Sequence, residues 1–368
     1  MNYATANARW AGIGPYYAMF PLSFVDEVVQ KYTCPGDTIL DPFAGRASSV
    51  FAGAALGRPS IGIEINPVGW VYGQTKLHPA SKGRVLARLH EIGALAKTLP
   101  PRTGDGLPEF FRWCFARSSL RFLLTARTYL DWRRSNVDRT LMTLILIDLH
   151  GGRTRSFSNQ MRQSRAMEPA YSIRWWRAHR QRPPLIAPVE FMEKKIEWRY
   201  AKGTPDLVYG EVLLGDSSRL LQKVEKQLTA GKIAPFQLLL TSPPYIGISD
   251  YYRDQWLRLW MLGGAPSYAR CGEDHKSDFG CKPAYTTLLR SVFEQAAELM
   301  KSKGVVYVRT DARQETFAIT RQVLYESFPH WRQKIIARPY HQQTQTVLYG
   351  DKSPKPGEKD IILYGPRR

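Results

Sequence analysis

The chain has 368 residues, 43% of them hydrophobic, which is enough for one large domain or two ordinary ones with a normal core. Its 52 Lys and Arg residues outnumber its 32 Asp and Glu residues, giving a formal net charge of +20. Such a charge is too large for an ordinary metabolic enzyme. It favours a polyanionic partner, most often nucleic acid, over a merely basic soluble protein.

The four cysteines are scattered and form no CxxC pair, so the sequence predicts no zinc site and fits a reducing cytosol. The first ten residues, MNYATANARW, lack the apolar core of a signal peptide. No apolar run is long enough to cross a membrane. We therefore expect a cytoplasmic protein without a metal and without a membrane segment.

The first part of the chain alternates between helix and strand patterns. Apolar residues at helical spacing predict a helix over 22–33, and "DTILDPFAG" over 37–45 predicts a short strand that ends in a turn. Small residues predict a helix over 46–57, and "SIGIEINP" over 60–67 predicts a second strand. A strand–helix–strand order of this kind is typical of a parallel sheet.

The alternation of strand and helix patterns stops between residues 80 and 205, where helical patterns dominate and Arg, Trp and Gln are frequent. The α/β rhythm then returns. The expected later strands cover 209–214, the leucines of "FQLLLTSPPY" (236–245), 304–310, 333–338, 345–349 and 360–364. The expected later helices cover 217–228, 251–262, 284–302 and 315–327. The polar loop 350–360 would join the last two strands as a hairpin.

These elements predict an α/β protein with a doubly wound, mostly parallel, Rossmann-like sheet and a C-terminal antiparallel hairpin. A basic helical region interrupts the sheet. We assign residues 1–79 and 206–368 to the sheet domain and 80–205 to the insertion.

Two turns at the carboxyl ends of strands have the residue types of a ligand site. Gly45 allows a close backbone approach at a helix start, and Glu64, nineteen residues further on, could accept both hydroxyls of a ribose. The full GxGxxG is missing, because Arg46 and Ala47 follow Gly45, which favours a cofactor with ribose and no pyrophosphate. The alternatives are a plain turn and a surface carboxylate. In the second turn, "TSPPY" over 241–245, proline stops the strand ladder.

Together, "DPFAG" and "TSPPY" resemble the S-adenosylmethionine-dependent DNA amino-methyltransferases, which modify the N4 amine of cytosine or the N6 amine of adenine. The resemblance covers most of 12–77 and 209–310, in the unpermuted order of the family. It implies S-adenosylmethionine as cofactor and a methyltransferase sheet. It does not cover 80–205, which we expect to be the target-recognition region. The residues that it places at the cofactor are Phe20, Asp41, Phe43, Ala44, Gly45, Glu64, Asp216 and Thr241. Asp216 could equally serve as a helix cap.

The catalytic residues implied by the resemblance are Ser242, Pro243, Pro244 and Tyr245. An exocyclic amine is a poor nucleophile until its nitrogen pyramidalises. The Ser242 hydroxyl and the Pro243 carbonyl could accept its hydrogens, with the prolines keeping that carbonyl fixed. Tyr245 could stack on the base. Serine in this turn is similar to the cytosine-N4 group, but the same turn would serve adenine N6.

Double-stranded DNA is the expected partner, and the target base would have to flip out of the duplex. The candidate DNA-binding residues are Arg153, Arg155, Arg162, Arg165, Arg174 and Arg177. Asn159, Gln160 and Gln163 could read base edges, although a solvated insertion is the simpler interpretation. RNA is an alternative substrate, and a catalytically silent DNA-binding protein is an alternative class. The family resemblance allows a cognate restriction endonuclease as a partner, and the oligomeric state stays open.

Overall fold

The computed structural model describes residues 3–15, 20–152, 154–246, 251–268, 281–339 and 357–366, except for the side chain of Tyr251. By their internal contacts the residues form two units. The sheet unit comprises 21–65, 207–249 and 276–368, and the helical unit comprises 1–20, 66–206 and 250–275. The helical unit thus includes residues on both sides of the expected insertion. The assignment of these segments to functional domains stays a prediction.

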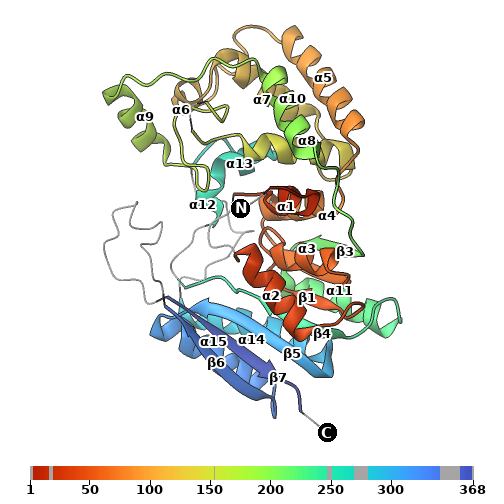
Figure 1. Cartoon of the computed structure of the whole chain (residues 1–368). Helices are drawn as coiled ribbons and strands as arrows, with labels where there is room; N and C mark the ends of the chain where they lie inside the picture. The colour runs from red at the N-terminus through yellow and green to blue at the C-terminus, as the bar shows by residue number, and fades with distance from the viewer. Residues whose placement is uncertain are drawn as a thin grey trace. The chain divides into compact units, whose positions relative to one another are not determined.

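The sheet unit is built on seven strands in the order β3-β2-β1-β4-β5-β7-β6 (Figure 1). The five strands from β3 to β5 are parallel, whereas β7 runs antiparallel to both β5 and β6. The strands are β1 (Ile39–Asp41), β2 (Ser60–Glu64), β3 (Gly210–Leu214), β4 (Phe236–Thr241), β5 (Met300–Asp311), β6 (Arg332–Arg338) and β7 (Glu358–Tyr364). This confirms the predicted fold class, a mostly parallel sheet with an antiparallel C-terminal pair. The strand expected at 345–349 and its hairpin loop lie outside the described residues.

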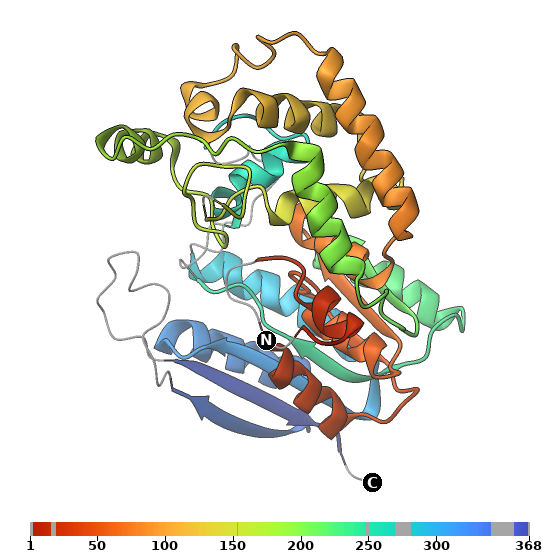
Figure 2. The same ribbon diagram turned by 45° about the horizontal axis from the view of Figure 1, so that its top comes forward.

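Helices cover both faces of this sheet, as doubly wound folds require (Figures 1 and 2). The helices of the unit are α2 (Leu22–Tyr32), α3 (Ser48–Ala55), α11 (Ser217–Thr229), α14 (Lys282–Glu298) and α15 (Gln314–Ser327). Side chains of α11, α14 and α15 form one apolar core with alternate residues of the strands, such as Leu40 and Leu239. On the other face, Phe24 and Tyr32 of α2 pack against Tyr307 of β5.

The helical unit is made of ten helices among its described residues. They are α1 (Ala6–Ala11), α4 (Pro67–Leu77), α5 (Lys82–Thr98), α6 (Glu109–Cys114), α7 (Arg117–Tyr129), α8 (Asn136–Ile147), α9 (Pro169–Ala178), α10 (Pro188–Tyr200), α12 (Tyr251–Asp254) and α13 (Trp256–Met261). The single helix expected over 251–262 is wrong, because Gln255 departs from helical geometry and separates α12 from α13.

Buried polar groups join the segments of the helical unit. Arg258 on α13 is fully buried and donates to the carbonyl of Leu146 at 3.0 Å and to the side chain of Gln255 at 2.7 Å. Guanidinium has five donors and so can satisfy several carbonyls at once. His150 lies near this charge, and burial together with Arg258 lowers its pKa, so the ring is neutral.

Candidate active site

The carboxyl end of β1 is closed by a tight turn whose centre is a buried carboxylate. Asp41 is 2% exposed, and its Oδ1 accepts from the backbone amide of Phe43 at 3.1 Å. The Ser49 hydroxyl, at the start of α3, donates to Oδ2. Burial raises the pKa of Asp41 from 3.8 to about 6, although these hydrogen bonds partly oppose the shift. The aspartate therefore fixes the turn between β1 and α3.

Gly45 and Glu64, paired in the sequence by spacing, are in direct contact in the structure. The Gly45 amide donates to Glu64 Oε2 at 2.6 Å, and Gly45 has φ +54°, a conformation that favours glycine. Glu64 ends β2 and is 7% exposed. The alternative of a surface carboxylate is thus wrong. Gly62 lies two residues before Glu64 in β2 and allows the turn after β1 to approach this strand closely. A Cβ added at Gly62 would lie 2.9 Å from the Cβ of Ala44.

The third strand of this half of the sheet contributes Asp216. It is the N-cap of α11, and its Oδ1 accepts from the amide of Ser218 at 2.9 Å and from the Ser218 hydroxyl at 2.8 Å. The capping role foreseen as one of its two uses is therefore present, and contact with an adenine stays a prediction. The neighbouring Ser217 donates to the carbonyl of Pro42, which ties this helix start to the turn after β1.

The catalytic turn predicted at TSPPY follows β4 and is joined directly to the first turn. β4 lies beside β1 in the sheet, and Thr241 Oγ1 donates to Asp41 Oδ1 at 2.6 Å. Thr241 is fully buried, Pro243 and Pro244 are buried, and Ser242 and Tyr245 are half-buried. The order of the strands changes direction between β1 and β4, because β2 and β3 lie on one side of this point and β5 lies on the other. Open α/β sheets bind ligands outside the carboxyl ends of the strands at such a point.

Side chains from the antiparallel part of the sheet complete the surroundings of the second turn. The Tyr245 hydroxyl lies 3.3 Å from Ser242 Oγ and donates to Oε1 of Glu358, the first residue of β7, at 3.2 Å. Arg313, in the loop that follows β5, donates to the carbonyl of Ile246 at 3.0 Å. No local signal in the sequence points to Glu358, because it follows a polar loop and lies 113 residues from Tyr245.

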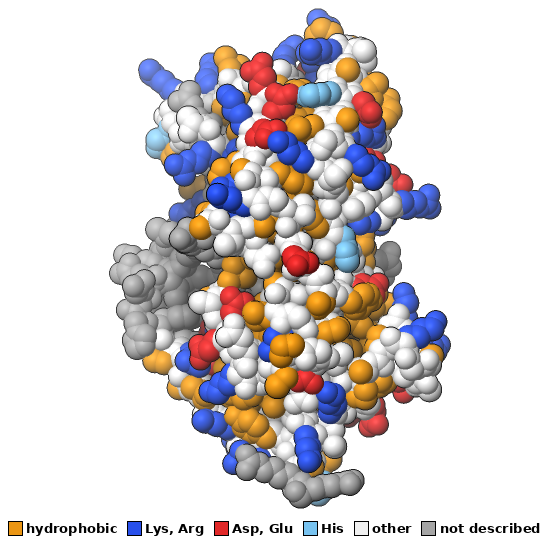
Figure 3. Space-filling view, turned by 45° about the vertical axis from the view of Figure 1, so that its right-hand side comes forward, with side chains coloured by type: hydrophobic (Ala, Val, Ile, Leu, Met, Phe, Trp, Pro, Cys, Tyr) orange, Lys and Arg blue, Asp and Glu red, His pale blue; other side chains and the backbone are white. Residues whose placement is uncertain are grey.

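Phe20 and the candidate DNA-binding residues belong to the helical unit. Phe20 is half-buried, and its assignment to the cofactor stays a prediction. Arg153 lies outside the described residues. Arg155, Arg174 and Arg177 are exposed, whereas Arg162 and Arg165 are half-buried. Lys and Arg side chains are scattered over the face shown in Figure 3 and are not gathered in one patch.

Two contacts change how the basic region is interpreted. Arg165 pairs with Asp254 at 3.0 Å, so part of its charge is already compensated. Asn159 is fully buried and its amide points to the carbonyl of Trp113 at 3.4 Å. Asn159 thus packs within the unit and does not present an amide to a base edge. Gln163 is exposed, although its amide reaches the carbonyl of Ile147 at 3.2 Å.

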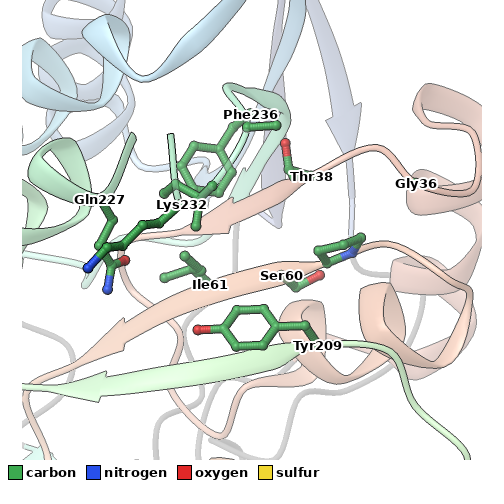
Figure 4. Close-up of a pocket in the computed structure, with 11 residues that line it drawn as sticks. Gly36, Thr38, Ser60, Ile61, Tyr209, Gln227, Lys232 and Phe236 are labelled. Atoms are coloured by element: carbon green, nitrogen blue, oxygen red, sulfur yellow. The ribbon is translucent and has the colours of Figure 1, made fainter. Parts of the chain in front are cut away.

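A cavity of about 440 Å³ opens at the opposite, amino-terminal edge of the sheet (Figure 4). It is lined by residues that precede or begin strands, including Thr38, Ser60, Tyr209 and Phe236, with Lys232 from the connection between α11 and β4. The hydroxyls of Thr38 and Ser60 already donate to the carbonyls of Pro235 and Arg58. This cavity is therefore separate from the turns at the carboxyl ends.

The sequence also predicted that the protein has no metal site and no membrane segment. Within the described ranges, no group of His, Cys, Asp and Glu side chains is arranged to hold a metal ion. A search of the same residues found no helix with the length and apolar character needed to cross a membrane.

Comparison with known proteins supports the predicted resemblance. Residues 2–68 match the N6/N4 methyltransferase family model, which is described as DNA methylase. The matched segment contains the turn after β1 and Glu64, so the chain resembles DNA methylases in this part. A search of curated proteins found no match.

Several solved structures align with nearly the whole chain at low identity. The rRNA methyltransferase aviRa from Streptomyces viridochromogenes aligns at 11% identity and a TM-score of 0.35, covering 99% of this chain and 96% of its own. TrmN from Thermus thermophilus aligns at 9% identity and a TM-score of 0.35, covering 98% of this chain and 52% of its own. A putative SAM-dependent methyltransferase from Streptococcus mutans has 10% identity and a TM-score of 0.34, covering 94% of this chain and 49% of its own. At these values the alignments do not distinguish one activity from another.

Proposed function

We propose that the protein is an S-adenosylmethionine-dependent DNA methyltransferase that modifies an exocyclic base amine, with cytosine N4 as the first candidate. The observation that carries this proposal is the bond from Thr241 to Asp41. It joins the strand that ends in TSPPY to the strand that ends in DPFAG, at the point where ligands bind in such sheets. The DNA methylase match over residues 2–68 supports the same activity.

The residues around the first turn fit a nucleoside cofactor without a pyrophosphate. The turn uses an amide of Gly45 and offers no run of glycines, while Glu64 holds a carboxylate at the strand end. We assign Glu64 to the ribose, Asp216 to the adenine amine, and Phe43, Ala44, Gly45 and Thr241 to the surrounding wall. Asp41 fixes the turn that carries these residues, and we assign it to the methionine end.

When bound, S-adenosylmethionine would supply an electrophilic methyl carbon: the amine nitrogen would form the new N–C bond as the S–C bond breaks, S-adenosylhomocysteine would leave, and the amine would lose one proton to water. Ser242 Oγ and the Pro243 carbonyl accept the two amine hydrogens and so favour a pyramidal nitrogen. The two buried prolines hold that carbonyl in place, so little reorganisation is needed as charge develops on nitrogen. The half-buried ring of Tyr245 offers a face for the base. A neutral serine is a weak base, and we assign it orientation only.

We assign the substrate from the net charge of the protein and from the position of the target amine within a base pair. A base amine in a duplex is paired, and flipping the base costs a few kcal/mol that contacts with phosphates help to offset. The net charge of +20 and the exposed Arg155, Arg174 and Arg177 suit that task. The site chemistry does not separate cytosine N4 from adenine N6, because both amines are delocalised into an aromatic ring.

One experiment tests the proposal. The protein is incubated with labelled S-adenosylmethionine and mixed-sequence duplex DNA, and the digested nucleosides are separated. We expect label in N4-methylcytosine; label in N6-methyladenine would move the assignment to adenine. Transfer to RNA with none to DNA would overturn the substrate, and no transfer to either would overturn the activity.

A matched pair of variants tests the catalytic role. Ser242→Ala should lower turnover by roughly 10²-fold or more while leaving cofactor affinity within about twofold, because it removes an acceptor used at the reacting amine. Thr286→Ala serves as the control, since this hydroxyl lies on the exposed side of α14 and bonds the carbonyl of Lys282. Equal loss of turnover and of cofactor binding in Ser242→Ala would remove the role assigned to Ser242.

A further inference from the structure

Glu358 is connected to the proposed catalytic serine through one tyrosine. Tyr245 Oη donates to Glu358 Oε1 at 3.2 Å and lies 3.3 Å from Ser242 Oγ. All three side chains are half-buried and belong to the sheet unit. Glu358 reaches this position because β7 begins there, opposite Asp311 of β5 in the antiparallel register.

The chemistry of the three groups fixes the direction of the hydrogen bonds. An ionised carboxylate can only accept, whereas a phenol can donate one hydrogen and accept another. Since the Tyr245 hydrogen points to Glu358, the tyrosine oxygen must accept from the Ser242 hydroxyl. The remaining lone pairs of Ser242 Oγ then face away from Tyr245, where they can accept a hydrogen from an amine.

We propose that Glu358 is a positioning residue for methyl transfer, acting through Tyr245 to keep the Ser242 hydroxyl turned so that its oxygen accepts from the target amine. This inference rests on the proposed function of the TSPPY turn. It also assigns Tyr245 two tasks, since its ring offers a face for the base while its hydroxyl transmits the orientation.

Charged neighbours hold Glu358 in place and influence its ionisation. Arg309 of β5 lies 3.7 Å from the Glu358 carboxylate and is itself bound to Asp360 of β7 at 2.7 Å. Arg338 of β6 stands opposite Glu358 in the register and pairs with Asp360 at 2.8 Å. Asp311 of β5, held by Arg313, adds negative charge on the same side.

These surroundings predict a pH dependence. Burial raises the pKa of Glu358, and so do Asp360 and Asp311, while Arg309 and the bond from Tyr245 act in the opposite direction. Once protonated, the carboxyl becomes a donor and no longer dictates the direction of the Tyr245 hydrogen. Turnover should therefore fall as the pH drops through a value above the ordinary range of glutamate.

The test compares Glu358→Gln with the wild-type protein at saturating S-adenosylmethionine and duplex DNA. Glutamine keeps the shape of the side chain, but its amide can donate or accept, so it does not fix the hydrogen-bond direction. We expect kcat to fall by roughly 10-fold or more, cofactor affinity to stay within about twofold, and the acidic limb of the kcat profile to disappear. Glu298→Gln, on the exposed end of α14, is the matched control and should keep the wild-type profile.

Tyr245→Phe interrupts the same connection while it leaves Glu358 and the aromatic ring in place. We expect a similar loss of kcat, and no further loss when Glu358→Gln is added, because both changes break one chain of hydrogen bonds. This variant decides the question if Glu358→Gln lowers the melting temperature. Glu358→Asp should restore the acidic limb in part.

The possible failures are distinguishable. A wild-type protein that transfers no methyl group to a base amine would overturn the proposed function. An active wild-type protein together with a Glu358→Gln or Tyr245→Phe variant of unchanged kcat and unchanged pH profile would overturn the role of Glu358 and leave the proposed function standing.

Discussion

Asp41 makes stability depend on pH in a direction opposite to that of most paired carboxylates. Its pKa is raised from 3.8 to about 6 because the side chain is buried at the strand end. Between these values the folded protein binds a proton that the unfolded chain has lost, so this group stabilises the fold more as the pH falls. The contribution is fully present below pH 3.8 and is lost as the pH rises through about 6.

The size of the effect follows from the two pKa values. From pH 8 to pH 5 the group adds roughly 1 kcal/mol to the free energy of unfolding of the wild-type protein. Asp41→Asn cannot ionise and loses this dependence. Its amide can still accept from the Phe43 amide and donate to Ser49, so the turn is kept. The difference in unfolding free energy between wild type and variant should therefore shift by roughly 1 kcal/mol toward the wild type on acidification.

Hydrogen exchange measures this difference locally. Peptides covering β1 and β4 are followed by mass spectrometry at pH 5, 6, 7 and 8, after correction for intrinsic exchange rates. Asp37→Asn is the control, because the ion pair with Lys301 at 2.7 Å and the Cys34 amide outweigh burial and lower the pKa of Asp37. This control should show almost no change over the same pH range. If the difference in unfolding free energy between the wild type and Asp41→Asn stays constant from pH 8 to pH 5, the raised pKa of Asp41 is refuted.

Four further substitutions test the cofactor turn and the basic surface. Glu64→Ala should weaken S-adenosylmethionine binding about tenfold or more in calorimetry, since it removes a charged acceptor and leaves the Gly45 amide without its partner; unchanged affinity would refute the ribose assignment. Gly62→Ala should lower the unfolding free energy by about 1–3 kcal/mol in urea titrations, because its methyl group would lie 2.7 Å from a side chain of α3; full stability would contradict the close approach. Arg155→Ala and Arg174→Ala should each reduce the slope of log K for DNA against log salt by about 0.9, and an unchanged slope would exclude that arginine as a phosphate contact.

Local signals explain why much of the sheet could be predicted from the sequence. Apolar runs that end at Gly or Pro predicted the positions of β1, β2 and β4 to within a few residues. Gly and Pro interrupt regular structure locally, so their effect can be recognised from the sequence alone. Gly45 and Glu64 were predicted to lie at one ligand site, since parallel neighbours bring their carboxyl ends to one edge. Their direct hydrogen bond was not predicted, and only the structure shows it.

Contacts that depend on strand order could not be predicted in the same way. Tyr245 meets Glu358 only because β7 inserts between β5 and β6 and runs antiparallel to both, and no residue near either position encodes that choice. The break at Gln255 was missed for a related reason, since its side chain is taken up by the buried Arg258. In each case a tertiary partner decided the outcome over local propensity.

The net charge illustrates how composition can mislead about binding. The +20 includes buried arginines, among them Arg58, Arg258 and Arg309. Arg58 and Arg258 are held by backbone carbonyls, and Arg309 is held by Asp360. Such buried charges still add to the field that attracts a polyanion, but they cannot touch a phosphate and release its counterions. The salt dependence of DNA binding should thus be shallower than the total charge suggests, because only exposed residues such as Arg155 and Arg174 can contribute to it.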